Sequence, residues 1–475
     1  MTSRPIHSPS VAIVGGGLAG LAAGCALADS GFRVILFERR PYLGGRASSY
    51  QHPGTGEVVD NCQHVLLGCC TNLIQFYERL GVQDKIRWYD RLTFLEPGGR
   101  ASIVAASALP APLHTAPSFL QAACLNFSDK LAIGRAMFAL ALDGKFEKGS
   151  GLAEETFLSW LERHDQTQHA IDRFWKTILV SALNEDLDRV SVRYAAQVVR
   201  ESFLKSAAAG RMGVPTVPLS ELYGVAGDYI QSRGGEIRLR SAVEAFESSA
   251  SGVQIVFAGE KQNFDFAVLA VSFDVLPRML PQGLEADALR TNLEQFESSP
   301  ITGIHLWFDR QVTDLDHAVL LDRTIQWMFH KSTLLAASSH AARPENGSYV
   351  ELVVSSSKAL VDKSRSEIVE LALNEFREFF PAARNANLVK STVIKEINAT
   401  YSPKPGVDAY RPKSETPWPT IFLAGDWVAT GWPATMEGAV RSGYMAAECV
   451  SKVAAKEAKF LAADLPAAGF MRLFA

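Results

Sequence analysis

The sequence predicts an α/β fold in which a discontinuous, Rossmann-like dinucleotide-binding domain is interleaved with an α+β domain that contains an antiparallel sheet. Three observations predict this arrangement. A strand–glycine turn–helix–strand pattern occupies residues 11–38, a strand ending in Gly-Asp leads to a helix within residues 420–439, and four strand-like segments lie between residues 301 and 397. Because the first two patterns lie near opposite ends of the chain, the dinucleotide-binding domain draws on distant segments.

The first pattern reads VAIVGGGLAGLAAGCALADSGFRVILFE. Gly15, Gly17 and Gly20 give the spacing GxGxxG after an apolar strand and before a helix of small residues. In this context Gly15 permits a tight turn, Gly17 lets the backbone approach a pyrophosphate, and Gly20 lets the helix pack closely on the sheet. Glu38 ends the second apolar strand, where it is placed to accept hydrogen bonds from a ribose 2′-hydroxyl.

The same stretch also has features of a signal peptide or a membrane span. Residues 11–28 are almost continuously apolar, with Arg4 in the place of a basic region and residues 26–28 in the place of a cleavage site. Cleavage there would destroy the strand–helix–strand unit, and no other segment reaches the roughly 20 clean apolar residues of a transmembrane helix. We therefore expect a cytoplasmic protein that is neither secreted nor membrane-spanning.

Length, charge and cysteine content narrow the class of protein. The chain of 475 residues exceeds what one core usually supports, so two domains are expected. A net charge of −4 gives no reason to expect a nucleic-acid partner. The six cysteines lack the spacing of a zinc site and include the adjacent pair Cys69 and Cys70, so we expect reduced thiols and no metal.

Several elements are predicted along the chain. A helix is expected over residues 71–80 with Thr71 as N-cap and Gly81 as its stop, followed by a hairpin over residues 91–104. Residues 118–142 predict two short amphipathic helices. Further predicted elements are helices near 222–233 and 366–380, paired strands at 243–246 and 253–257, a buried strand at 264–271, and strands of the second sheet at 301–308, 325–329, 349–354 and 389–397.

The order of these elements suggests where the domains begin and end. The dinucleotide-binding domain is predicted to comprise residues 1–75, 217–290 and 415–460. The substrate-binding domain would then comprise residues 76–216 and 291–414, leaving 461–475 as a C-terminal tail.

Two further motifs carry a resemblance to a known superfamily. Gly44-Gly45-Arg46 follows Glu38, and its arginine can approach a phosphate or a flavin. Near the other end, Gly425-Asp426 ends a strand, and a helix begins near Thr435. Together these motifs resemble the flavin amine oxidase and carotenoid desaturase superfamily, whose FAD-binding domain is of the amine-oxidase type. Two signatures at opposite ends of the chain argue for FAD over NAD.

The resemblance implies a set of cofactor-binding residues. In the superfamily the Gly-Asp loop meets the pyrophosphate and ribityl chain, and the N-terminus of the later helix faces the flavin's N1–C2=O edge, where it stabilises negative charge. The residues implied for FAD binding are Gly15, Gly17, Leu18, Ala19, Gly20, Glu38, Arg39, Gly45, Arg46, Val243, Gly425, Asp426, Thr435 and Met436.

Finer details resemble the bacterial hydroxysqualene dehydroxylases, flavoenzymes related to phytoene desaturases. The resemblance covers nearly the whole chain and is most specific in the block DNCQHVLLGC, residues 60–69, with SALN at 181–184 and VPLSEL at 217–222. Cys62 departs from the glycine expected there. The resemblance implies that reduced flavin N5 delivers hydride to an allylic carbon of hydroxysqualene while the hydroxyl departs as water, giving squalene for hopanoid synthesis.

Hydroxide is a poor leaving group, so this reaction needs a proton donor. His64 is the first candidate, since an unperturbed imidazole pKa near 6.5 suits work close to neutral pH. Asp60, Asn61 and Gln63 are tentative catalytic candidates, with Asp60 and Asn61 able to orient His64 or bind the hydroxyl. The alternative is that His64 only positions flavin or backbone. Trp427 and Trp432 are candidates for contact with the flavin or for ordinary core packing.

Other functions remain open at this stage. A carotenoid-type desaturase or an amine oxidase of the same fold would reduce the flavin with its substrate, whereas a prenyl-lipid-binding protein would not catalyse at all. The presence of the full set of flavin-binding motifs argues against a non-catalytic prenyl-lipid-binding protein. There is no second GxGxxG for NADPH, so the sequence does not identify the electron donor.

A long isoprenoid substrate also predicts contact with a membrane surface. Each methylene left in water costs about 0.8 kcal/mol, so uptake from a bilayer is far easier than uptake from solution. Residues 118–142 and the apolar tail 469–474 are the candidate contact surfaces. We expect peripheral attachment to the inner face of the cytoplasmic membrane.

Overall fold

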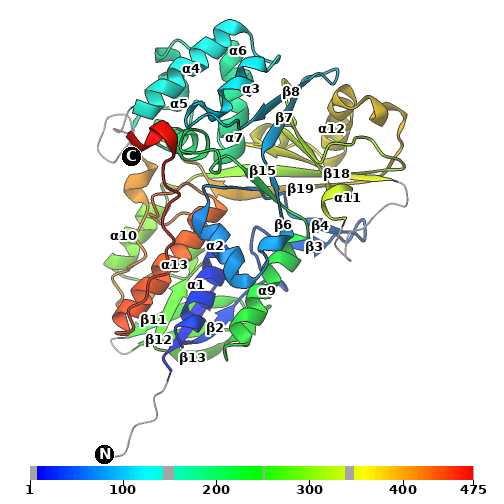
Figure 1. The fold of residues 1–475 in the computed structure, drawn as a ribbon. Helices are drawn as coiled ribbons and strands as arrows, with labels where there is room; N and C mark the ends of the chain where they lie inside the picture. Colours follow the sequence, from blue (N-terminus) through cyan, green and yellow to red (C-terminus); the bar gives the residue numbers. More distant parts are fainter. Residues whose placement is uncertain (1–7, 143–153, 250–251, 337–346, 474–475) are drawn as a thin grey trace, which may run out of the picture.

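The computed structural model describes residues 8–142, 154–249, 252–336 and 347–473, so Arg4 and Phe474 lie outside the described residues. A parallel sheet with helices on one face and a small antiparallel sheet on the other occupies one end of the molecule, and a larger mixed sheet with a group of helices occupies the other (Figure 1). The predicted fold class is confirmed. The parallel sheet consists, in spatial order, of β10 (Glu236–Arg238), β2 (Arg33–Phe37), β1 (Ser10–Val14), β14 (Phe266–Leu269) and β20 (Ile421–Leu423).

Three helices cover this parallel sheet. They are α1 (Leu18–Asp29), α9 (Leu219–Gln231) and α13 (Met436–Val453), and α1 packs between the other two. Glycine makes the α1–α13 contact close, since a Cβ at Gly443 would lie 2.2 Å from the Ala19 carbonyl oxygen. The α1 helix, which the small residues predicted, is therefore buried on all sides, and a sheet strand and two helices from distant segments meet around it.

A three-stranded antiparallel sheet lies beside the parallel sheet. It contains β11 (Val243–Ser249), β12 (Gly252–Phe257) and β13 (Glu260–Phe264), the first two of which form the predicted pair. The buried strand predicted over residues 264–271 is shorter, because the chain ends β13 at Phe264 and turns at Asp265 before β14 begins. Asp265 accepts hydrogen bonds from the backbone and side chain of Ser10, both at 2.7 Å, which fix this turn against β1.

The second large sheet has seven strands and includes all four predicted segments. One pair, β7 with β16, is parallel, so the sheet is mixed rather than wholly antiparallel. The sequence did not predict β16, which is only four residues long. In spatial order the strands are β19 (Leu388–Tyr401), β15 (Ser298–Phe308), β18 (Ser348–Ser355), β17 (Trp327–His330), β16 (His317–Leu320), β7 (Arg91–Leu95) and β8 (Ala101–Ala105).

Helices cover this end of the molecule. The two helices predicted over residues 118–142 are present as α3 (Ala116–Gln121) and α4 (Phe127–Leu142). The other helices here are α5 (Phe157–Arg163), α6 (Gln168–Ala170), α7 (Thr177–Leu183), α8 (Val192–Val199), α11 (Lys331–Leu334) and α12 (Arg365–Phe379), with π-helical turns at Ile171–Lys176 and Arg200–Leu204. The helix α10 (Leu284–Leu293) lies at the other end, on the side of α13 (Figure 1).

Short strands connect the two ends of the molecule. β3 (Ser49–Gln51) pairs with β4 (Val58–Asp60). β9 (Met212–Pro215) pairs with both β5 (Leu66–Leu67) and β6 (Ile86–Tyr89).

The helix α2 (Thr71–Leu80) corrects one predicted terminus. Gly81 ends the helix in a left-handed conformation with φ of 69°, as predicted, but the N-cap is Cys70 rather than Thr71. The first turn is capped from outside by a carboxylate, since Glu437 accepts hydrogen bonds from the backbone N–H groups of Asn72 at 3.2 Å and Leu73 at 2.8 Å. This long-range cap explains why the local sequence pointed to the wrong residue.

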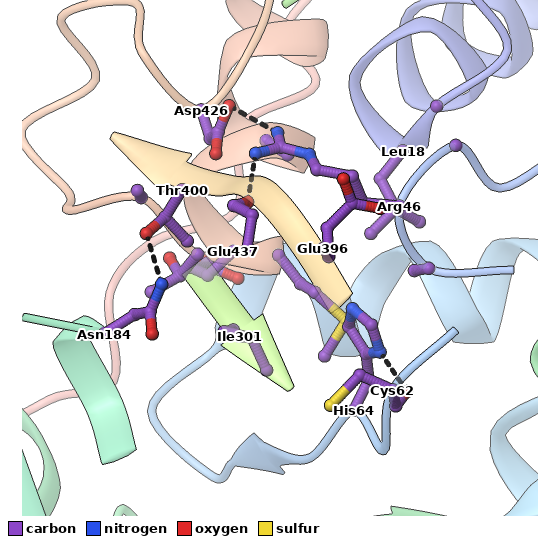
Figure 2. A pocket seen from close by; sticks show the side chains of 18 of the residues that line it. Leu18, Arg46, Cys62, His64, Asn184, Ile301, Glu396, Thr400, Asp426 and Glu437 are labelled. Atoms are coloured by element: carbon purple, nitrogen blue, oxygen red, sulfur yellow. Dashed lines mark hydrogen bonds and ion pairs between the residues drawn. The ribbon is translucent and has the colours of Figure 1, made fainter. Parts of the chain in front are cut away.

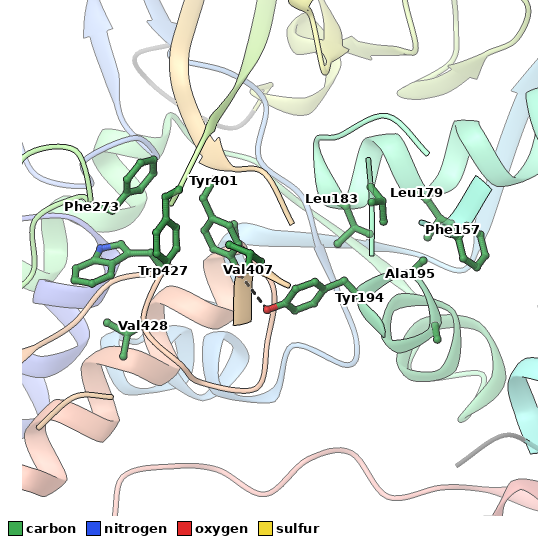
Figure 3. Packing of buried hydrophobic residues seen from close by; sticks show 14 of the residues in the cluster. Phe157, Leu179, Leu183, Tyr194, Ala195, Phe273, Tyr401, Val407, Trp427 and Val428 are labelled. Carbon is green, nitrogen blue, oxygen red and sulfur yellow. Dashed lines mark hydrogen bonds between the residues drawn. The ribbon is translucent and has the colours of Figure 1, made fainter. Parts of the chain in front are cut away.

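One hydrophobic cluster runs from the parallel sheet into the helical part (Figure 3). It joins Phe37 and Leu423 of the parallel sheet to Leu183 and Tyr194 of the helical part. The two ends of the molecule therefore share a core. Within the described parts of the chain, no helix is long and apolar enough to cross a membrane.

The cap of α12 gives a test of the fold. Ser364 accepts a hydrogen bond from the Glu367 backbone N–H at 3.3 Å, and the Glu367 side chain accepts one from the Ser364 backbone N–H at 2.8 Å. Ser364→Ala should lower the free energy of unfolding by about 1 kcal/mol. The neighbouring exposed substitution Lys363→Ala is the control, and equal thermal or denaturant midpoints for the two variants would contradict this cap.

Candidate active site

A cavity of about 600 Å³ lies where the two ends of the molecule meet. Its walls come from the carboxyl ends of β1, β2 and β14, the loop after β20, the N-terminus of α13, and the face of the mixed sheet. Ligands of open α/β sheets bind at this edge of the strands. The predicted cofactor residues that line the cavity are Gly15, Gly17, Leu18, Ala19, Glu38, Arg39, Gly45, Arg46, Val243, Gly425, Asp426, Thr435 and Met436.

The glycine turn has one open position and two crowded ones. Gly15 adopts φ of +111°, and a Cβ there would lie 2.6 Å from the Ala270 carbonyl oxygen. A Cβ at Gly20 would lie 2.0 Å from the Gly15 carbonyl oxygen, and Gly20 itself packs behind the cavity wall. At Gly17 the nearest atom to a Cβ is 3.9 Å away. The backbone at Gly17, the N-cap of α1, is thus left open to a diphosphate approaching the helix terminus.

Glu38 is a fixed hydrogen-bond acceptor beside this turn. One carboxylate oxygen accepts from the Gly16 backbone N–H and the other from the Arg40 backbone N–H, each at 2.7 Å. The side chain is buried, yet it lines the cavity. Since each carboxylate oxygen can accept a further hydrogen bond, this arrangement fits a ribose hydroxyl.

Arg46 connects the N-terminal glycine loops to the C-terminal Gly-Asp loop. Its guanidinium lies 2.7 Å from Asp426 and donates to the Ala399 carbonyl oxygen at 2.5 Å (Figure 2). The sequence suggested that Arg46 approaches a phosphate or a flavin. In the structure it lines the cavity while it is paired with Asp426, so its first role is to hold two walls of the cavity together.

The N-terminus of α13 points its free N–H groups at the cavity. Thr435 is the N-cap, and its hydroxyl accepts a hydrogen bond from the Gly438 backbone N–H at 3.1 Å. This terminus favours negative charge in the adjacent space. Glu437 in the first turn is fully buried, lines the cavity and bonds α2, so it is a site residue that sequence reasoning missed. An acid in the first turn of a helix was the available signal.

His64 lines the cavity with a defined ring orientation. Its Nδ1 lies 2.7 Å from the Cys62 carbonyl oxygen, to which it donates, leaving Nε2 as the nitrogen with a free lone pair (Figure 2). Burial lowers the pKa of His64 below its ordinary value of 6.5. The expectation of an imidazole that titrates near neutral pH is therefore corrected: at pH 7 the ring is neutral and Nε2 is a hydrogen-bond acceptor.

The other candidates beside His64 occupy different places. Asn61 and Gln63 line the cavity, and Asn61 donates to Glu396 at 3.0 Å. Asp60 is not part of the lining, because its carboxylate is bound by Lys331 at 2.5 Å. Burial would raise the pKa of Asp60, but the Lys331 ammonium and the hydrogen bonds from Ser49 and Leu219 together outweigh it, so the pKa lies below its usual value. Asp60 is thus ionised and does not hold a proton for donation.

Three further predictions concern Cys62 and the two tryptophans. Cys62 turns its side chain into a hydrophobic cluster with Met212 and Phe329, and burial holds the pKa of its thiol well above the usual range. Trp427 is a core residue whose indole N–H donates to the Val271 carbonyl oxygen at 3.0 Å. Trp432 lines the cavity, with the Arg441 guanidinium 4.7 Å from its ring centre.

The part of the cavity lined by the helices and the mixed sheet is mostly apolar, with a few polar residues such as Ser181, Gln197 and Glu201. Phe94, Ile178, Val198, Met212, Phe329 and Val353 are among its lining residues. Among the described residues, the arginines that line the cavity are Arg39, Arg40 and Arg46, and no lysine lines it. These arginines lie at the end of the cavity expected to bind the nucleotide, which we call the nucleotide end. The described residues also contain no group of three or more His, Cys, Asp or Glu that could hold a metal ion.

Comparison with known proteins agrees with this geometry. The model of a family described as flavin-containing amine oxidoreductase matches residues 18–451. The chain is 28% identical to a 15-cis-phytoene desaturase of Synechococcus elongatus over 93% of this chain and 95% of that one. It is also 28% identical to a probable zeta-carotene desaturase of the same organism, over 93% and 98%.

Solved structures show the same fold at lower identity. An oxidoreductase from Methanosarcina mazei has a TM-score of 0.70 at 16% identity, covering 91% of this chain and 98% of its own. Wild-type putrescine oxidase bound to putrescine has a TM-score of 0.69 at 17% identity, covering 95% and 99%.

The open space at Gly17 gives a test of cofactor binding. Gly17→Val should abolish stoichiometric FAD, because the new side chain fills the space where a diphosphate must approach the backbone. Gly224→Val in α9 is a matched control, since nothing lies within 4 Å of a Cβ there. Flavin absorbance per mole of purified protein is the readout. Full flavin content in Gly17→Val would show that the diphosphate binds elsewhere.

Proposed function

The chain belongs to the flavin-containing amine oxidoreductase family, and from this premise we propose that it reductively removes the hydroxyl group of hydroxysqualene to give squalene. FAD is the cofactor, as is typical of the family. When bound and reduced, FAD supplies the hydride for the allylic carbon. Hydroxysqualene and two reducing equivalents then give squalene and water.

The observation that carries this proposal is the position of the residue block 60–69. This block resembles the hydroxysqualene dehydroxylases most specifically, and eight of its ten residues line the cavity: Asn61, Cys62, Gln63, His64, Val65, Leu66, Leu67 and Cys69. A family-specific sequence at the wall between the nucleotide end and the apolar end is well placed to select a substrate.

The lining of the cavity favours a neutral, mostly hydrocarbon substrate. Among the described residues, the apolar end of the cavity has no lysine or arginine that could bind a diphosphate group on a substrate. Its aliphatic and aromatic side chains suit a long isoprenoid. His64 supplies a polar atom at the boundary. In the neutral ring Nε2 can accept a hydrogen bond from an allylic hydroxyl, and in the protonated ring the same atom donates to the hydroxyl oxygen, so either state can fix which carbon faces the flavin.

A second candidate function is desaturation of a carotenoid precursor. The two relatives at 28% identity are carotenoid desaturases by name. A neutral His64 with a free Nε2 also suits a general base, which desaturation needs when a C–H bond loses its proton. The two functions place opposite demands on His64, because dehydroxylation needs the protonated ring and desaturation the neutral ring.

Direction of electron flow separates the two functions. Reduced holoenzyme mixed anaerobically with hydroxysqualene should regain the absorbance of oxidised flavin and form squalene in equal amount. Oxidised holoenzyme should stay unbleached with phytoene, squalene or putrescine. Bleaching by phytoene, without reoxidation by hydroxysqualene, would assign the chain to the desaturases.

The pH dependence of the rate gives a second discrimination. If protonated His64 donates to the leaving hydroxyl, dehydroxylation is present below the lowered pKa of His64 and is lost as pH rises through it, in the range below 6.5. If His64 instead acts as a general base, the rate should rise as pH rises through its pKa. Rates of flavin reoxidation between pH 5 and 8 test this point, with flavin content measured at each pH.

His64 itself should matter for turnover and not for the cofactor. His64→Ala should retain FAD and fold while losing about 10²–10⁴ in the rate of reoxidation by hydroxysqualene. His64→Gln, which can form a hydrogen bond but cannot donate a full proton, should be rescued only in part. His52→Ala is the control, as His52 lies outside the cavity lining. Normal turnover by flavin-replete His64→Ala would remove His64 from the mechanism.

An exposed apolar surface supports peripheral attachment to a membrane. On α4 and the end of α3, Leu120, Phe127, Leu131 and Phe138 are between 54% and 78% exposed. They line a shallow groove together with the cations Lys130 and Arg135, a combination that suits an anionic lipid surface.

The C-terminal segment runs back to the helical part of the molecule (Figure 1). The Phe470 backbone N–H donates to the Ala111 carbonyl oxygen at 2.8 Å, and Phe470 and Leu473 are 52% and 78% exposed. The tail expected to contact the membrane is thus bonded to the chain shortly before α3, apart from Phe474, which lies outside the described residues.

This surface can be tested by sedimentation with liposomes. Phe127→Glu/Phe138→Glu should abolish binding to vesicles that contain anionic lipid, since burying two carboxylates in the interface is costly. Leu284→Glu is the matched control, because Leu284 is 88% exposed on α10, away from the groove. Failure of the wild-type chain to sediment at any lipid composition would contradict peripheral attachment.

A further inference from the structure

A buried cluster of charged side chains lies behind the cavity wall that carries His64. The ammonium of Lys331, at the start of α11, is 2.5 Å from Asp60, 2.8 Å from the side-chain oxygen of Gln63 and 3.5 Å from Glu351. The side chains of Lys331, Asp60 and Glu351 are 1%, 3% and 0% exposed. A lysine is almost never buried to this extent unless it is paired.

The segment 60–64 crosses the face of the mixed sheet and covers this cluster. Glu351 on β18 shares a face with Val353 and Ser355, which line the cavity. On the adjacent strand β15, a Cβ at Gly303 would lie 3.4 Å from the Asn61 carbonyl oxygen. The glycine therefore makes room for the segment, which separates the charged cluster from the cavity.

The three charged groups of the cluster differ in whether they stay ionised near neutral pH. Burial would lower the pKa of Lys331, but Asp60 and then Glu351 outweigh it, so the pKa is raised and the ammonium stays charged. Burial raises the pKa of Glu351 to about 7. Asp60 and Lys331 thus form the permanent ion pair, and Glu351 carries a proton below neutral pH.

The ion pair anchors the segment on both sides of Cys62. Asp60 also accepts hydrogen bonds from the Ser49 hydroxyl at 2.5 Å and the Leu219 backbone N–H at 3.1 Å. Gln63 accepts from Lys331 and donates through its amide to the His64 carbonyl oxygen at 3.1 Å. These bonds fix the backbone whose Cys62 carbonyl orients the His64 ring.

We propose that Lys331 is a positioning residue that fixes segment 60–64 and, through it, the imidazole of His64 at the cavity wall. This inference rests on the role proposed above for His64. Stability alone does not account for the cluster, because a buried ion pair is often replaceable by apolar side chains without loss of stability. What an apolar replacement cannot supply is the directional bond from Lys331 to Gln63.

The charge-balanced variant Asp60→Asn/Lys331→Met tests the proposal. It removes the ion pair, and Glu351, which loses the nearby Lys331 cation that lowers its pKa, stays protonated, so no buried charge remains and flavin content and thermal midpoint should stay close to wild type. The kcat with hydroxysqualene should fall at least tenfold, with KM changed less than threefold. In a His64→Ala background the same pair of substitutions should change kcat less than twofold. Lys404→Met, which removes a surface lysine paired with Glu297, is the control.

An equal loss of kcat in both backgrounds would contradict action through His64. If the double variant does not fold, Gln63→Leu cuts the same link and should show the same dependence on His64. The NMR signals of the His64 ring provide a readout without substrate. They can be assigned in isotope-labelled protein by their loss in His64→Ala, and they should shift in Asp60→Asn/Lys331→Met. Unchanged ring signals would overturn the positioning role, whereas a wild-type enzyme that makes no squalene would overturn only the proposed function.

Discussion

The ion pair between Arg46 and Asp426 is the contact on which the cavity depends. It joins residues 380 positions apart, and the same guanidinium bonds the Ala399 carbonyl at the end of the mixed sheet. Charge-assisted bonds of this kind are short and directional. Arg46 thereby holds the glycine loops, the Gly-Asp loop and strand β19 in one arrangement, and the space between them is the cavity.

A second constraint acts at the opposite wall. A long hydrocarbon gives an enzyme few features by which to choose one carbon among many, so a fixed polar atom in an apolar cavity has a large effect on selection. His64 provides that atom. Its ring donates to the Cys62 carbonyl oxygen, and its own carbonyl oxygen accepts a hydrogen bond from Gln63, so both the ring and the backbone are held in place. The charged groups that secure this segment, Asp60 and Lys331, face away from the cavity, so they can fix the wall without exposing a charge to the substrate.

Much of the fold could be predicted because its signals are local. The glycine spacing at Gly15, Gly17 and Gly20 and the apolar periods of the long strands depend on neighbours in sequence. The contacts that shape the site do not: Lys331 lies 271 residues from Asp60, and Glu437 caps α2 from 364 residues away. No pattern around Lys331 marks it as buried. The ionised state of Asp60 could not be predicted for the same reason, since its carboxylate is paired with this distant cation.

The central claim is that one cavity brings the flavin and an allylic hydroxyl together at His64. Oxidised holoenzyme cannot reduce hydroxysqualene, so a crystal structure of that complex would capture the bound substrate without turnover. The account predicts the hydroxyl oxygen within hydrogen-bond distance of His64 Nε2, about 2.6–3.2 Å, with the hydrocarbon chain in the apolar end of the cavity. A substrate bound outside the cavity, or with its hydroxyl directed away from His64, would contradict it.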